Sequence, residues 1–205
     1  MKLIKIDSSD IKLPKKNLPE NAKIIYSPME EELSSKSFVY GILITILLVI
    51  LGITKKIIIG KQIFIFDGGI IDILSITVVP LTMTFIFIPI HEFIHILATP
   101  FSSTVYFGVL KEAGGLFIIS DGKMSKCRFL IMTILPFSFL LLFLAIPITF
   151  FTVDNPIIHN SLFFFTYFSL LCCSGDLYNF QVVWKKVPNG SFIQVSERDT
   201  YYFYD

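Results

Sequence analysis

Three residues that commonly perform metal and proton-transfer chemistry lie within five positions of this sequence: His91, Glu92 and His95. They form the pattern H-E-x-x-H. On a helix, residues four positions apart share one face, so the two imidazoles can converge on a single metal ion. Neutral imidazole suits Zn²⁺, and three protein ligands leave one position open for water. Zinc lowers the pKa of such a water to about 7, and Glu92 lies close enough to take its proton. The pattern predicts a zinc-dependent hydrolase with Glu92 as the catalytic residue.

The composition of the chain is that of an integral membrane protein. Of its 205 residues, 54% are hydrophobic and 16% are charged, and the mean hydropathy is +0.73. A soluble domain typically carries about 25% charged residues. Two of the three histidines lie in the motif, and Glu92 is the only acidic residue between Asp72 and Glu112. Because ionisable groups in hydrocarbon are costly unless they are paired or functional, this placement favours a metal site over a chance match.

Four apolar segments are long enough to cross a bilayer as helices, at about 1.5 Å of rise per residue. We expect these spans at Phe38–Thr54, Ile73–Ala98, Phe129–Thr152 and Ser161–Trp184. The loop Val153–Asn160 joins the last two.

Two short runs of β-branched and aromatic residues, one on each side of a turn that contains glycine, predict a small β-hairpin at the membrane interface. One hairpin is expected in Ile57–Phe66, and another pairs Thr104–Leu110 with Leu116–Ser120. Short strands are also expected near Ala22–Tyr26 and Thr200–Tyr204. The predicted fold class is therefore an all-α membrane protein with about four transmembrane helices and one or two small β-hairpins at the interface.

These segments divide the chain into a polar cytoplasmic tail (1–36), a transmembrane metallopeptidase-like domain (37–184) and a cytoplasmic C-terminal tail (185–205). Orientation follows from lysine and arginine, which are in excess on the cytoplasmic side. The two tails and the loop after the second span hold fourteen of them, and the opposite side holds three. We therefore expect a multi-pass protein of the cell membrane with both termini in the cytoplasm. The net charge of +1, with no long basic run, argues against nucleic acid as a partner.

A third metal ligand must come from outside the motif. Asp176 lies nine residues before Lys185, and His91 lies nine residues before Pro100, so helical rise puts both about 13 Å from the same membrane boundary. Equal depth favours Asp176, although it also fits a hydrogen bond between packed helices. The other candidates are Cys173, whose thiolate suits zinc, Glu112 in the predicted hairpin, and His159, which we expect to be a solvated loop residue.

Several of these segments resemble the bacterial DUF3267 family of zincin peptidases. The resemblance covers about residues 80–205 and rests on Pro89–His95, Phe107-Gly108, Ser174–Leu177 and Pro188–Ser191. That family is similar in layout to site-2-type intramembrane metalloproteases, in which an Asp on a later helix completes the zinc site. The resemblance implies zinc ligands at His91, His95 and Asp176, and Glu92 as the catalytic acid or base. The Asn-Pro that precedes the late glycine in many site-2 proteases is missing here.

The leading hypothesis is zinc-dependent hydrolysis of peptide bonds within the membrane, with a peptide or membrane-protein substrate and the lipid bilayer as partners. A second hypothesis is a non-catalytic membrane protein with a structural metal site, which needs four protein ligands. A metal transporter is a third, but it requires more intramembrane carboxylates than Glu92 and Asp176.

Overall fold

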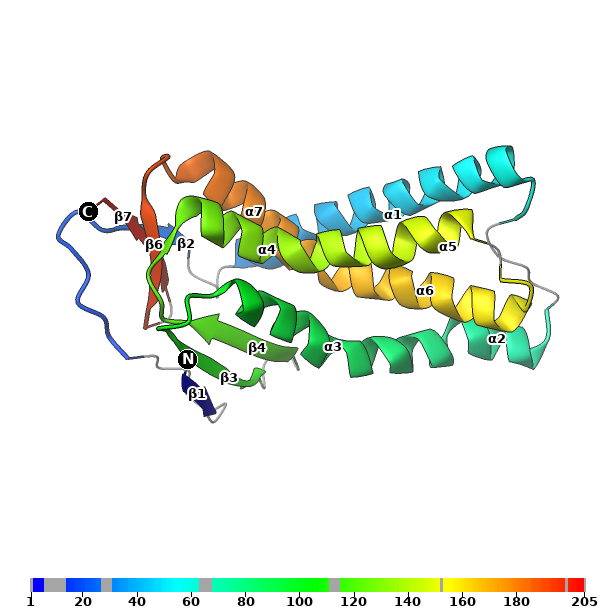
Figure 1. Ribbon diagram of the computed structural model, residues 1–205, viewed down its shortest axis with the longest axis horizontal. Helices are drawn as coiled ribbons and strands as arrows, with labels where there is room; N and C mark the ends of the chain where they lie inside the picture. The colour runs from blue at the N-terminus through cyan, green and yellow to red at the C-terminus, as the bar shows by residue number, and fades with distance from the viewer. Residues whose placement is uncertain are drawn as a thin grey trace.

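The computed structural model describes residues 2–5, 14–26, 31–62, 68–110, 115–151, 153–197 and 199–204. Within them, four helical segments run side by side, and the strands gather with both chain ends at one end of this bundle (Figure 1). Each segment is long and apolar enough to cross a membrane: Lys36–Ile59, Ile70–Ala98, Lys126–Phe150 and Pro156–Lys186. The predicted fold class is confirmed: the protein is mostly helical, with four potential membrane spans and a few small strands.

The first span, α1, runs over Glu31–Ile59, longer than the apolar segment that predicts it. It ends at Gly60, which has φ +74° and donates its backbone N–H to the Lys56 carbonyl. Glycine takes this left-handed conformation without strain and therefore commonly terminates helices. The hairpin expected in Ile57–Phe66 is consequently wrong over 57–59, which are helical, and its residues 63–66 lie outside the described part of the chain.

The second span consists of α2 (Ile70–Ile76) and α3 (Val78–Ala98), which meet at Thr77. Pro89 lies inside α3, two residues before His91, and its ring removes one backbone donor from the helix. The third span is α4 (Lys126–Leu140), the π-helical turn η1 (Leu141–Ala145) and α5 (Ile146–Phe150). Both potential spans are thus interrupted helices rather than single regular ones.

The fourth span consists of α6 (Pro156–Cys172) and α7 (Ser174–Lys186), separated at Cys173. The side chain of Asn155 accepts hydrogen bonds from the backbone N–H groups of Ile157 (3.0 Å) and Ile158 (3.2 Å). Asn at the N-cap followed by Pro at the first helical position is a strong helix start. The helix therefore begins five residues earlier than expected. His159 is helical and only 6% exposed, so its assignment as a solvated loop residue is wrong.

One small sheet contains the predicted hairpin. β3 (Thr104–Leu110) and β4 (Gly115–Ser120) pair antiparallel, with Val105 opposite Ser120, which confirms that prediction. β1 (Lys2–Lys5) adds parallel to β3, giving the order β1-β3-β4.

A second sheet joins residues from both tails, in the order β2-β7-β6-β5. Its strands are β2 (Lys23–Tyr26), β5 (Met124–Ser125), β6 (Phe192–Ser196) and β7 (Asp199–Phe203). The positions of β2 and β7 confirm the two short strands expected from the sequence. Residues of the N-terminal tail therefore belong to both sheets, because β2 pairs with β7 and β1 pairs with β3.

Arg128 attaches the end of α3 to the start of α4. Its Nε donates to the Ala98 carbonyl (2.7 Å) and its Nη2 donates to the Thr99 carbonyl (2.8 Å). The last carbonyls of a helix have no partner within the helix, and a cation there also interacts favourably with the helix dipole. Arg128 therefore fixes the C-terminal end of α3, the helix that carries the H-E-x-x-H motif.

Candidate metal centre

His91 and His95 lie one turn apart on α3, and both side chains are turned into the bundle. They are 7% and 9% exposed, and their ring centroids lie 5.0 Å apart. Their Nε2 atoms lie 3.3 Å apart. The structure thus brings the two imidazoles together, as the spacing of the motif predicts.

Asp176 reaches the same point from α7, the second half of the fourth span. Its Oδ2 lies 3.1 Å from Nε2 of His91 and 3.4 Å from Nε2 of His95. The three atoms form a nearly equilateral triangle. Zinc bonds to imidazole nitrogen and carboxylate oxygen are about 2.0–2.1 Å long, which gives a tetrahedral edge of roughly 3.3–3.4 Å. The triangle has the dimensions of one face of such a tetrahedron, so these residues fit a zinc ion.

The Met132 carbonyl on α4 orients the ring of His95. Its oxygen lies 2.9 Å from Nδ1 of His95, and a carbonyl can only accept a hydrogen bond. Nδ1 therefore carries a proton, and in the neutral ring Nε2 presents its lone pair to His91 and Asp176. A hydrogen bond of this kind on the far nitrogen is typical of histidines that bind metals, because it fixes both tautomer and ring orientation.

The Asp176 carboxylate faces two imidazoles, which carry a positive charge only when they are protonated. Its Oδ2 is buried and accepts no hydrogen bond from the described residues, although two imidazole nitrogens lie within 3.4 Å. Buried polar atoms almost always have a hydrogen-bond partner, and an exception calls for an explanation such as an ion. When both rings are neutral with Nε2 unprotonated, three lone pairs are directed at one another and repel, and a divalent cation between them would remove that repulsion.

Cys173 lies beside the cluster, on the other side of the His91 ring. Its Sγ is 3.8 Å from Nδ1 of His91, while Nε2 of that ring faces Asp176. The ligand atoms of His91, Cys173 and Asp176 lie within 4.8 Å of one another, so these three residues form an alternative donor set. We favour the set with His95. One imidazole binds an ion through one of its two nitrogens, and Nε2 of His91 faces both His95 and Asp176, whereas Cys173 lies at Nδ1.

Glu92 follows His91 on α3 and is partly buried. Its carboxylate makes no hydrogen bond or ion pair with the rest of the described chain. A carboxylate next to a metal site that no protein donor engages can accept a proton from water. This position fits the catalytic role that the motif predicts for Glu92.

Two further ligand candidates from the sequence remain. Glu112 lies outside the described residues. His159 lies fourteen positions before Cys173, so helical rise places it about 21 Å from the cluster, near the other end of the bundle. No sequence pattern marks the Met132 carbonyl, because a backbone contact between two helices depends on their packing and not on the side chain at that position.

Comparison with known proteins identifies a family. The model of the family DUF3267, described as "Putative zincin peptidase", matches residues 84–192, which include the part of α3 that carries the motif, the β3–β4 hairpin and Asp176. No curated protein matches the sequence, and no solved structure matches it. Because the matched region spans more than half of the 205 residues, the chain belongs to the DUF3267 family.

Proposed function

We propose that this protein is a zinc-dependent peptidase that hydrolyses peptide bonds within the membrane, with His91, His95 and Asp176 as zinc ligands and Glu92 as the catalytic acid or base. The observation that carries the proposal is the triangle of ligand atoms, 3.1 to 3.4 Å on each side, with no hydrogen bond to Oδ2 of Asp176 from the described residues. Membership in a family described as zincin peptidases supports the same chemistry.

Zinc, when bound, acidifies a water molecule and polarises the scissile carbonyl. The protein supplies the proton transfers. Glu92 accepts a proton from the attacking water and returns it to the nitrogen of the leaving amine, so it acts first as a base and then as an acid. His95 keeps its Nε2 lone pair available because its Nδ1 proton is held by the Met132 carbonyl.

The β3–β4 hairpin supports a way of binding an extended peptide. α3 packs against β4, and β4 pairs with no described strand other than β3. A peptide that adds to a free strand edge gains main-chain hydrogen bonds largely independent of its sequence. We propose that substrate binds at β4 in this way, close to the motif helix. The alternative, that the hairpin is only an interfacial loop, predicts no effect of hairpin mutations on substrate affinity.

The proposed topology places both termini, the 1–36 and 185–205 tails and the strands in the cytoplasm. The excess of lysine and arginine on that side supports it. The strands and both chain ends also lie together at one end of the bundle, which is consistent with the proposed topology (Figure 1).

A structural metal site is the second candidate, and the proximity of Cys173 favours it. Such a site requires four protein ligands and no position for water. Zinc bound by Cys173 together with the two histidines and Asp176 would support this alternative and contradict a peptidase.

The test is to compare Glu92→Gln with the wild-type protein after purification in zinc-containing buffer. We expect equal zinc content, and peptide cleavage lowered by at least about 100-fold, the usual contribution of a catalytic acid or base. Glu20→Gln, at an exposed position, is the matched control and should cleave like the wild type. Retained turnover in Glu92→Gln would refute the assigned role.

A further inference from the structure

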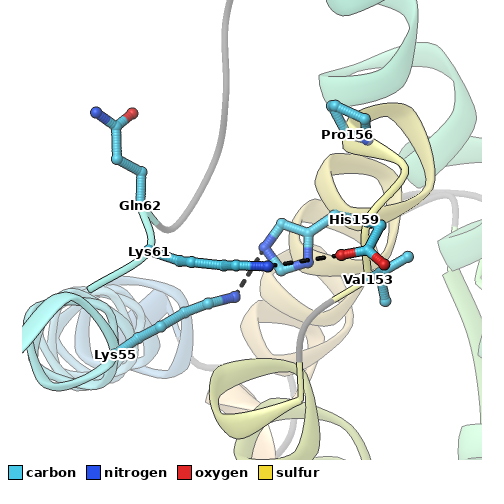
Figure 2. A pocket seen from close by; sticks show the side chains of 7 residues that line it. Lys55, Lys61, Gln62, Val153, Pro156 and His159 are labelled. Carbon is cyan, nitrogen blue, oxygen red and sulfur yellow. Dashed lines mark hydrogen bonds and ion pairs between the residues drawn. The ribbon is translucent and has the colours of Figure 1, made fainter. Parts of the chain in front are cut away.

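A second polar site lies at the opposite end of the bundle from the metal centre. A cavity of about 450 Å³ is lined there by the end of α1 and the start of α6, with polar side chains from Lys55, Lys61, Gln62, Asp154 and His159. Figure 2 shows the Lys55 side chain extending to His159, with the Lys61 side chain beside it reaching Asp154. The peptidase proposal makes no use of these residues.

Lys55 is the central residue of this cavity. It is 2% exposed, although lysine is almost never fully buried unless it is paired. Its Nζ donates to the Ile148 carbonyl (3.2 Å) and contacts Nε2 of His159 (3.0 Å). An ammonium group has three protons and can only donate, so Nε2 of His159 accepts and one ammonium proton remains for another partner.

Both of these partners are neutral. The carbonyl carries no charge, and an imidazole that accepts a hydrogen bond at Nε2 is uncharged. Among the described residues, no carboxylate forms an ion pair with Lys55. An opposite charge stabilises a buried ammonium group, so an anion from outside the described chain would stabilise the charged form of Lys55.

The surroundings add further positive potential. Lys61 reaches the same cavity and pairs with Asp154 at 3.5 Å, but these side chains are 55% and 95% exposed, so the pair is weak and an incoming anion can replace Asp154. Pro156 at the start of α6 lines the cavity too, and a helix N-terminus carries a partial positive charge. The Asn155 side chain already accepts from two N–H groups there, so the helix contributes its dipole.

The position of the cavity identifies the class of anion. It lies where α1 ends and α6 begins, at the ends of two helices long and apolar enough to span a membrane, and the ends of such spans are where lipid phosphates are expected. Lysine binds phosphate as a point charge. We propose that Lys55, assisted by Lys61, forms a binding site for a phosphate group, carried by a phospholipid headgroup or supplied as free phosphate.

The experiment measures binding to the full-length protein, purified in detergent and stripped of lipid. Three probes are titrated: dioleoylphosphatidylglycerol, dioleoylglycerol, which has the same chains but no phosphate, and inorganic phosphate. We expect phosphatidylglycerol to bind more tightly than dioleoylglycerol. Displacement of the lipid by inorganic phosphate would identify free phosphate as a sufficient ligand, and binding of the lipid without displacement would identify the headgroup as the source. Equal binding of the two lipids, with no binding of inorganic phosphate, would overturn the proposal.

Variants test the role of Lys55. Lys55→Gln should bind the preferred probe about tenfold more weakly or worse, as expected for the loss of a charged hydrogen bond. Lys56→Gln, at the exposed neighbouring position, is the matched control and should bind like the wild type. Asp154→Asn should bind more tightly, because it removes a competing carboxylate, and this exposed substitution does not threaten folding. Equal affinity of Lys55→Gln and Lys56→Gln, or weaker binding by Asp154→Asn, would contradict the site.

Discussion

The backbone carbonyl of Met132 lies 2.9 Å from Nδ1 of His95 and joins α4 to the motif helix. This contact fixes the His95 ring so that its Nε2 faces His91 and Asp176. Three helical segments, α3, α4 and α7, therefore contribute to one centre. The site depends on how these helices pack as much as on the residues of the motif.

Asp176→Asn should lower zinc affinity by about 10- to 100-fold or more, because a neutral amide replaces a charged ligand. Cys173→Ser should leave the zinc content at one ion per chain, since Sγ faces the other nitrogen of His91. The measurement is zinc content after dialysis against graded chelator concentrations. Cys172→Ser, at the exposed neighbouring position, is the control. A larger loss of zinc from Cys173→Ser than from Asp176→Asn would show that the ligand assignment is wrong.

Arg128→Gln should destabilise the fold by about 1.5–3 kcal/mol, because the Ala98 and Thr99 carbonyls lose charged hydrogen bonds at the end of α3. Thermal unfolding of the purified protein checks this. Lys126→Gln, which loses only exposed contacts two residues away, should change stability much less. Similar melting temperatures for the two variants would mean that Arg128 does not hold the end of the motif helix.

Tyr106 on β3 gives a prediction for alkaline pH. Burial, together with the nearby charge of Asp121, raises the pKa of its phenol above the ordinary value of 10.0. The folded protein therefore holds this proton more tightly than the unfolded chain. The resulting stabilisation is complete below about pH 10 and is lost as the pH rises through the higher pKa of the folded state.

Tyr106→Phe cannot ionise at this position, so its unfolding free energy should fall less steeply above about pH 10 than that of the wild type. Chemical unfolding at a series of pH values measures the slope. Tyr204→Phe, at a residue that is 45% exposed, is the control and should keep the wild-type slope. An unchanged slope in Tyr106→Phe would contradict the effect of burial.

Local patterns predicted the membrane spans and the convergence of the motif histidines. Long apolar runs need no tertiary context to be recognised, and residues at i and i+4 share a helix face in any helix. The equal depth of His91 and Asp176 was also visible in the sequence, and the structure places their side chains 3.1 Å apart.

Other features depend on partners far away in the chain. β1 pairs with β3, about 100 residues later, and its own four residues show no strand pattern. Because Lys55 is charged, the sequence predicts that the first span ends before it. In the structure α1 continues past Lys55, and the Lys55 side chain is buried against α6. His159 was misassigned because the start of α6 is set by Asn155 and Pro156, two polar or helix-breaking residues that also occur in loops.

X-ray absorption spectroscopy at the zinc edge tests the central claim most directly. We predict one zinc ion per chain with only nitrogen and oxygen neighbours at about 2.0–2.1 Å, supplied by His91, His95, Asp176 and water. A sulfur neighbour at about 2.3 Å would place Cys173 on the metal and contradict an open catalytic site. Failure of the zinc-replete protein to retain any ion would contradict the metal centre altogether.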